Sequence, residues 1–133
     1  MMKPFHLSFV VPSLEQAKTF YTEVLGCEIG RDTGGWIDII FFGHQITIHQ
    51  ENAFVSARPI DHFGPILSKS EWLRVAQRCE EKNIQLEMPR TVKDSGLPTE
   101  AGKFLIKDPA GNLLEFKYYN ADSSPLTSAG KSS

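Results

Sequence analysis

Two histidines and one glutamate are the residues of this chain best suited to chemistry. His6 and His62 occupy matching places in two strand-like segments, and each segment leads into a helix-like stretch. Glu115 lies in a third strand-like segment, directly after the turn 108–112. Two imidazoles and one carboxylate on separate strands make up the ligand set of an open divalent-metal site. The sequence therefore predicts that His6, His62 and Glu115 bind one metal ion.

The neighbours of Glu115 support this prediction. Leu113, Leu114 and Phe116 surround the glutamate with apolar side chains, which predicts that its carboxylate is substantially buried. An unpaired buried carboxylate costs free energy, so a cation is its natural partner.

The elements that must position these residues occur in the same order twice, as a strand, a helix and three strands. In the first half, Ser13 with Gln16 predicts a capped helix that ends at Gly26. The predicted strands of this half are the segment around His6 and the segments 27–31, 36–42 and 45–50.

The second half repeats the pattern with a helix that we expect to begin at Ser70 and to end at Asn83. Its predicted strands are 60–67, 84–88, 103–107 and 113–119. The polar segment 90–101, broken by Gly96 and Pro98 and followed by Gly102, predicts a long loop of the kind that serves as a lid or is simply mobile.

We therefore predict one α+β domain over residues 1–119, made of two tandem βαβββ modules at about 4–52 and 58–119. Two such modules would form a curved mixed sheet around a cup-shaped site. Residues 120–133 are small and polar, which predicts a flexible C-terminal tail.

Composition excludes several classes of function. The chain has 133 residues, 41% of them hydrophobic, and a net charge of −2, which gives no reason to expect nucleic acid as a partner. No apolar run approaches the ~20 residues of a membrane span, and the first residues lack a hydrophobic signal core. Cys27 and Cys79 lack metal or redox spacing and suit a reduced protein. The expected location is cytoplasmic, with neither nucleic acid nor membrane as a partner.

Several motifs give the chain a family resemblance over about residues 4–119. The best markers are Phe20-Tyr21, the segment Val24–Cys27 and the segment Asp108–Phe116. With them, the chain resembles the vicinal oxygen chelate superfamily of glyoxalases, extradiol dioxygenases and bleomycin- and fosfomycin-resistance proteins. Further segments resemble a small bacterial extradiol-dioxygenase-like subgroup: Trp36–Asp38, Phe42–Gln45, His49 and His62–Gly64. The resemblance implies a small-molecule substrate and a homodimer.

The internal repeat also bears on a fourth ligand. When the turn glycines Gly43 and Gly111 are aligned, Glu115 corresponds to Thr47, where glyoxalase I generally carries a ligand. A neutral hydroxyl is a poor ligand for a borderline metal, so three ligands with open positions fit better. This set is typical of non-heme Fe(II), although Mn, Ni and Zn also suit it.

Further residues are candidates for roles near the metal, and the resemblance implies the role of His49. His49 lies two residues beyond Thr47 on the same strand face and is predicted to handle protons, with an extra ligand or a structural role as alternatives. Gln45 shares that face, and it could contact a substrate together with Thr47 or orient His49. Arg31 and Lys117 are candidates for holding an anionic substrate group, or else are solvated strand ends.

The leading function is an extradiol-like dioxygenase that acts on a small substrate with two adjacent oxygens. Extradiol enzymes of the superfamily usually supply a Tyr from the strand before the glutamate, and the segment 103–107 has none. A metal-dependent isomerase, epimerase or lyase with His49 as base is therefore the second hypothesis. A non-enzymatic binding protein of the resistance type is the third.

Overall fold

The computed structural model describes residues 4–51, 60 and 62–120. They belong to two compact units, one formed by residues 1–61 with 108–112 and the other by residues 62–107 with 113–133. Most of the segment between the two modules and the predicted tail at 121–133 lie outside the described residues.

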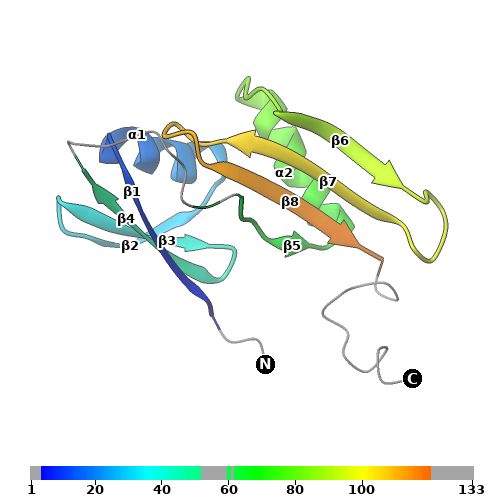
Figure 1. Cartoon of the computed structure of the whole chain (residues 1–133), viewed down its shortest axis with the longest axis horizontal. Helices are drawn as coiled ribbons and strands as arrows, with labels where there is room; N and C mark the ends of the chain where they lie inside the picture. The colour runs from blue at the N-terminus through cyan, green and yellow to red at the C-terminus, as the bar shows by residue number, and fades with distance from the viewer. Residues whose placement is uncertain (1–3, 52–59, 61, 121–133) are drawn as a thin grey trace. The chain divides into compact units, whose positions relative to one another are not determined.

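The first unit contains a strand, a helical segment and three further strands (Figure 1). These are β1 (His6–Val11), α1 (Leu14–Thr19), the π-helical turn η1 (Phe20–Val24), β2 (Glu28–Asp32), β3 (Trp36–Phe41) and β4 (His44–Gln50). Its sheet has the order β1-β4-β3-β2, in which β1 is parallel to β4 and the other pairs are antiparallel.

The second unit repeats this arrangement with β5 (Ile66–Leu67), α2 (Lys69–Glu81), β6 (Met88–Lys93), β7 (Ala101–Lys107) and β8 (Leu113–Tyr119). The order β5-β8-β7-β6 is the same mixed topology as in the first sheet. The predicted α+β fold of two βαβββ modules is therefore confirmed, with a separate four-stranded sheet in each module.

Local signals place the first helix as predicted. The Ser13 side chain accepts a hydrogen bond from the Gln16 backbone N–H at 3.2 Å, which satisfies one of the otherwise unpaired donors of the first turn. Gly26 has φ of +75°, a conformation that costs glycine little and ends the helical stretch.

The predicted start of the second helix is wrong by two residues. Ser68, not Ser70, is the N-cap, because Glu71 completes a reciprocal capping box with it. The Ser68 hydroxyl accepts from the Glu71 N–H while the Glu71 carboxylate accepts from the Ser68 N–H. At the other end Asn83 adopts φ of +57°, which confirms it as the stop.

Two predicted strands of the second half are also wrong. In the segment 60–67 only Ile66–Leu67 forms a strand, preceded by an isolated bridge at Phe63, because Pro65 has no N–H for a longer ladder. The second strand of this unit, β6, begins at Met88 rather than Ile84, and it takes up the first part of the predicted loop 90–101.

The sequence pattern did not predict β6 over its actual residues, because β6 is an edge strand. Its residues after Met88 are all exposed, the apolar Pro89 and Val92 included, and backbone pairing with β7 holds them in the sheet. An edge strand of this kind has no hydrophobic alternation for sequence analysis to detect.

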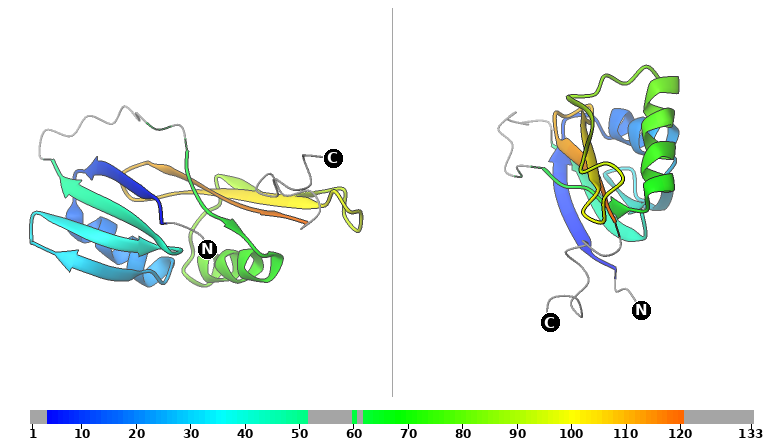
Figure 2. Two further views of the ribbon diagram at one scale, coloured as in Figure 1. Left: turned by 90° about the horizontal axis from the view of Figure 1, so that it is seen from below. Right: turned by 90° about the vertical axis from the view of Figure 1, so that its right-hand side faces the viewer.

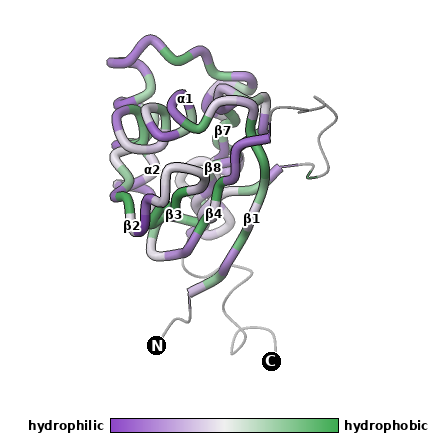
Figure 3. Tube along the Cα trace, turned by 90° about the vertical axis from the view of Figure 1, so that its left-hand side faces the viewer, coloured by the Kyte–Doolittle hydropathy of each residue, from purple (hydrophilic) through white to green (hydrophobic). Residues whose placement is uncertain are grey.

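Each sheet has one covered face and one open face. In Figure 2, α2 lies along one face of its own sheet, and the covered faces contain the core. On β1 the core side chains are Phe9 and Val11, and Figure 3 shows β1 as hydrophobic over most of its length toward Val11. The core of the second unit centres on Trp72, which is 1% exposed and donates from its indole N–H to the Phe116 carbonyl at 2.9 Å.

No helix within the described ranges is long and apolar enough to span a membrane.

Candidate functional site

The open face of the first sheet carries most of the predicted site residues. His6 is opposite Gln45, and Val10 is opposite His49, in the parallel pairing of β1 with β4. Thr47 lies between Gln45 and His49 along β4, and it is opposite Asp38 of β3. Strand alternation thus brings His6, Gln45, Thr47 and His49 onto one face, as expected from their spacing.

A chain of hydrogen bonds fixes the orientation of His6. The Gln45 amide donates from Nε2 to Oδ1 of Asp38 at 3.2 Å, and its Oε1 lies 3.0 Å from Nδ1 of His6. A carboxylate only accepts, so the amide nitrogen must face Asp38 and the amide oxygen must face His6. In the neutral imidazole, His6 Nδ1 therefore carries the proton, and Nε2 presents a lone pair. A metal-binding imidazole is commonly held in this way.

Asp38 joins three of the predicted site residues by hydrogen bonds, and the sequence analysis did not identify it. Its side chain is buried and accepts from the Arg31 guanidinium, from Gln45 and from the Thr47 hydroxyl, the last at 2.8 Å. The bond from Arg31 is the main cause that lowers the pKa of Asp38. One signal was available in the sequence, because Asp38 is the single charged residue within the apolar strand Trp36–Phe41.

Arg31 lies between this carboxylate and solvent. Its guanidinium pairs with Asp38 and stacks over the Trp36 ring at 4.8 Å, while 66% of the side chain stays exposed. Arg31, Asp38 and Gln45 line a pocket of about 270 Å³ that also includes Pro4 and His44. Two of the predicted substrate contacts, Arg31 and Gln45, thus line one pocket, and both bind Asp38.

The strand registers support the correspondence between Thr47 in the first module and Glu115 in the second. Thr47 is opposite Ser8 on β1, and the pairing of Ile66 with Lys117 puts Glu115 level with Gly64 in the second unit. Because the Thr47 hydroxyl donates to Asp38, the first unit uses this position to hold a buried carboxylate.

His49 lies two residues beyond Thr47 on the same face of β4. Its ring centroid is 6.1 Å from that of Trp36, and the residue is half-buried. Within residues 4–51, 60 and 62–120, no hydrogen-bond partner holds either ring nitrogen of His49. Both nitrogens are therefore available for proton transfer.

The second unit brings together the other two predicted ligands. Nε2 of His62 lies 3.5 Å from Oε1 of Glu115, and the glutamate side chain is 13% exposed. Backbone bonds secure the arrangement, since the Glu115 N–H donates to the Phe63 carbonyl at 2.8 Å and the Phe63 N–H donates to the Leu113 carbonyl. The predicted burial of Glu115 is thus largely confirmed.

Gly64 makes this approach possible. A Cβ at position 64 would lie 1.7 Å from the carbonyl oxygen of Glu115, far inside van der Waals contact. Only glycine lets the backbone beside His62 come so close to β8.

Lys117 lies two residues beyond Glu115 on the same face of β8. Its ammonium is 3.9 Å from the Glu115 carboxylate and 5.2 Å from the centroid of the Tyr119 ring. Hydrogen bonding to Tyr119 is the main cause that raises the pKa of Lys117, and the charge of Glu115 adds to it.

The predicted metal ligands thus divide between the units, with His6 in the first and His62 and Glu115 in the second. In the part of the chain that the structure describes, no group of three His, Cys, Asp or Glu side chains gathers at one point. The three-ligand set stays a prediction.

Comparison with known proteins identifies the family. The model of the Glyoxalase/Bleomycin resistance protein/Dioxygenase superfamily matches residues 3–116. The chain belongs to this superfamily.

Solved structures agree with this assignment. A glyoxalase/bleomycin resistance protein/dioxygenase from Alicyclobacillus acidocaldarius is 32% identical, with a TM-score of 0.75 over 90% of this chain and 93% of that one. A search of curated proteins gave no match.

Two more distant structures share the fold. The fosfomycin resistance protein FosX from Listeria monocytogenes is 15% identical, with a TM-score of 0.69 over 92% of this chain and 98% of that one. A lactoylglutathione lyase from Agrobacterium tumefaciens is 22% identical, with a TM-score of 0.66 over 87% and 92% of the two chains.

Proposed function

We propose that this superfamily member is a metal-dependent enzyme, and that its reaction is an extradiol-like dioxygenation of a small substrate with two adjacent oxygens. His6, His62 and Glu115 hold one divalent ion, with Fe(II) as the first choice and Mn, Ni or Zn as alternatives. The observation that carries the proposal is the close pair of His62 and Glu115, whose nitrogen and oxygen atoms are 3.5 Å apart while the glutamate side chain is 13% exposed.

The chemistry of the donors fits a metal ion. A shared cation would compensate the negative charge of Glu115 on a side chain that is only 13% exposed. The hydrogen bond from His6 Nδ1 to Gln45 leaves Nε2 as the coordinating atom. A carboxylate and two neutral imidazoles supply the mixed oxygen and nitrogen set that Fe(II) and its neighbours accept.

A bound ion of this type would supply positive charge to two adjacent substrate oxygens and leave positions open for a further small molecule. The protein side chains have separate tasks. His49 accepts or returns a proton of the substrate, since its ring nitrogens have no hydrogen-bond partner among the described residues. Arg31, Gln45 and Thr47 orient the substrate from the first unit, and Lys117 holds an anionic group from the second.

A second reaction is supported by one feature of β7. Extradiol enzymes of the superfamily usually supply a Tyr from the strand before the glutamate, and Ala101–Lys107 contains none. A metal-dependent isomerase, epimerase or lyase needs only a base beside the metal, and His49 can serve as that base. Oxygen uptake separates the two reactions, because only the dioxygenase consumes O₂.

Metal content is the first test. Protein purified without oxygen, chelator or nickel affinity resin is expected to contain about one iron or manganese per chain and to consume O₂ with a catechol. Zinc or nickel without O₂ uptake would favour the isomerase or lyase. A chain that holds no metal after reconstitution would contradict the proposal and would favour a binding protein.

The ligand assignment is tested by Glu115→Ala. Loss of one of three ligands should weaken metal affinity by at least about 100-fold. Glu87→Ala is a matched control in the same unit, because Glu87 pairs on the surface with Lys107 at 3.5 Å. Equal metal affinity in the two variants would remove Glu115 from the site.

A further inference from the structure

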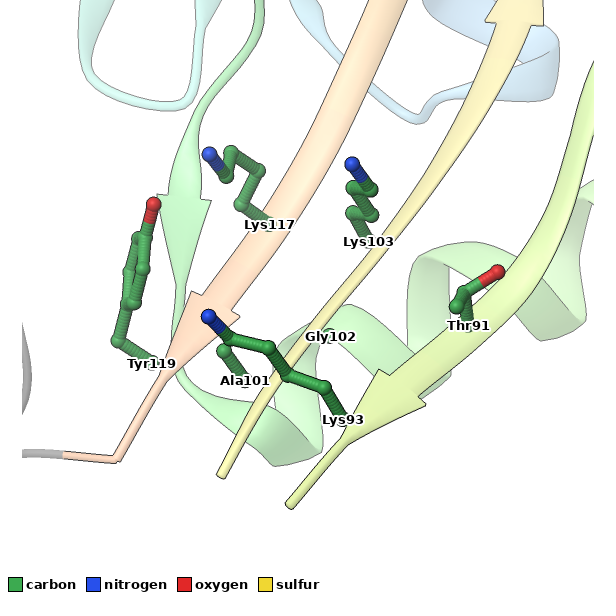
Figure 4. A pocket seen from close by; sticks show the side chains of 7 residues that line it. All are labelled: Thr91, Lys93, Ala101, Gly102, Lys103, Lys117 and Tyr119. Atoms are coloured by element: carbon green, nitrogen blue, oxygen red, sulfur yellow. The ribbon is translucent and has the colours of Figure 1, made fainter. Parts of the chain in front are cut away.

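The open face of the second sheet contains a pocket of about 240 Å³ (Figure 4). Its lining residues come from the three neighbouring strands β6, β7 and β8: Thr91, Lys93, Ala101, Gly102, Lys103, Lys117 and Tyr119. Three of the seven are lysines, and no acidic residue is among them. Of this set, only Lys117 was a candidate from the sequence.

The sheet register explains how the charges come together. Lys103 of β7 is directly opposite Lys117 of β8, and Thr91 of β6 is opposite Lys103. In the next row, Lys93 is opposite Ala101. Cross-strand neighbours have Cβ atoms roughly 5 Å apart, so like charges at these positions destabilise the sheet unless a counter-charge is present.

Two acidic groups of this unit are paired with lysines outside the pocket. Glu100 binds Lys69 at 2.9 Å, and Glu87 pairs with Lys107 at 3.5 Å. Within residues 62–120, Lys93 and Lys103 have no ion-pair partner, and Lys117 reaches only Glu115 at 3.9 Å. Positive charge on this face therefore exceeds the negative charge that the unit places beside it.

The shape of the pocket allows a small molecule to reach the three ammonium groups. Ala101 supplies a short side chain at the floor, and the Tyr119 ring forms one wall. Figure 4 shows Lys93 extending over Ala101 toward Tyr119, while Lys103 and Lys117 extend on the same side of the sheet. A ligand here would meet an aromatic ring and three donors that turn freely toward oxygen atoms.

We infer that this pocket binds the oxyanion group of a small molecule, a carboxylate or a phosphate-like group, through Lys93, Lys103 and Lys117. Lysine ammonium groups act as point charges and make charge-assisted hydrogen bonds to either kind of group. Anion binding of this kind does not depend on a metal.

The distance from the pocket to Glu115 limits which substrates could contact both. Lys117 and Glu115 are two residues apart on one strand, so their Cα atoms are about 6.7 Å apart. If Glu115 binds the metal as proposed above, the substrate has two adjacent oxygens at one end and an anionic group a few bonds away. This second step rests on the proposed function, whereas the anion site stands without it.

The test uses the full chain after chelator treatment, so that a metal plays no part. Inorganic phosphate and benzoate are titrated in separate experiments by calorimetry or by amide chemical-shift changes. Lys103→Met should weaken binding of the preferred anion by about tenfold or more, because it removes one charged donor and keeps the side-chain length. Binding by the parent chain should also weaken as salt rises.

Lys107→Met is the matched control. Lys107 lies on the same strand and the same face as Lys103 but outside the pocket. Ala101→Leu is the second probe, since it fills the floor without changing charge. Unchanged binding in Lys103→Met, or an equal loss in Lys107→Met, would overturn the inference. Both lysines are exposed, so both variants should fold.

The two anions and the metal assay distinguish the remaining outcomes. Preference for phosphate or for benzoate identifies which oxyanion the pocket takes, and binding of neither contradicts the inference. Anion binding by a chain that also fails to take up metal on reconstitution would sustain the pocket and reject the metal proposal. Metal binding without anion binding would do the reverse.

Discussion

Gln45 determines which nitrogen of His6 is available, although it has no charge and lies one strand away. Its amide is held by Asp38 on one side, and Asp38 is held in turn by Arg31 and Thr47. This network orients the imidazole, so loss of one member should affect metal binding without direct contact with the ion.

Gln45→Ala should therefore change the His6 tautomer. In metal-free protein at a pH where the imidazole is neutral, ¹⁵N chemical shifts of the ring should show the proton on Nδ1 in the parent chain. They should show a mixture in the variant, and metal affinity should fall about 10- to 100-fold. Gln16→Ala, on the exposed face of α1, is the control. An unchanged tautomer would contradict the role of Gln45.

At the scale of elements, Gly64 sets the distance between the chain segment of His62 and the strand β8. A methyl group at this position would collide with the Glu115 carbonyl, so the backbone would have to move away. Gly64→Ala should lower the free energy of unfolding by about 1–3 kcal/mol and should weaken metal binding. The measurements are urea unfolding and metal affinity. Gly35→Ala, where no atom lies within 4 Å of the added Cβ, should be far milder.

Glu100 secures the loop between β6 and β7. Its carboxylate accepts from the Gly96 N–H at 2.8 Å and from the Tyr118 hydroxyl at 2.7 Å, and it pairs with Lys69. These bonds, the Gly96 N–H first, lower the pKa of Glu100 to about 2. Instead of a long loop over 90–101, the structure has a short connection that its own last residues hold in place.

The lowered pKa predicts an acid-dependent loss of stability. Unfolded glutamate titrates near pH ~4.3, so the stabilising contribution of Glu100 is complete above that pH and is lost as pH falls toward 2. Urea unfolding should show Glu100→Gln less stable than the parent chain at pH 6, with the difference shrinking between pH 4.5 and 2. Glu81→Gln, at the exposed end of α2, should show no such convergence. A constant difference across this range would count against the lowered pKa.

At the scale of the whole molecule, the described residues give each sheet two edge strands, β1 and β2 in the first and β5 and β6 in the second. Unpaired edges favour association, and the family resemblance implies a homodimer. Sedimentation velocity should therefore give a mass near twice the 14.9 kDa of one chain. A mass equal to one chain at micromolar concentration would reject the dimer.

The sequence by itself determined the features that depend on neighbouring residues. Spacing of apolar side chains and the cap at Ser13 were enough for the first helix, and β8 begins and ends where alternation predicted. The repeat of His6 at His62 was also visible, because each residue keeps its place relative to its own strand. Such signals are local, so they survive without knowledge of the fold.

Only the tertiary structure decided which distant residues act together. Asp38 can bind the Thr47 hydroxyl because β3 places the two residues opposite each other. Lys93, Lys103 and Lys117 lie together because of the register in which β6, β7 and β8 pair. The edge strand β6 was hidden for the same reason, since backbone pairing rather than its own side chains holds it in place. Strand pairing joins residues across long stretches of sequence, and no local pattern records the partner.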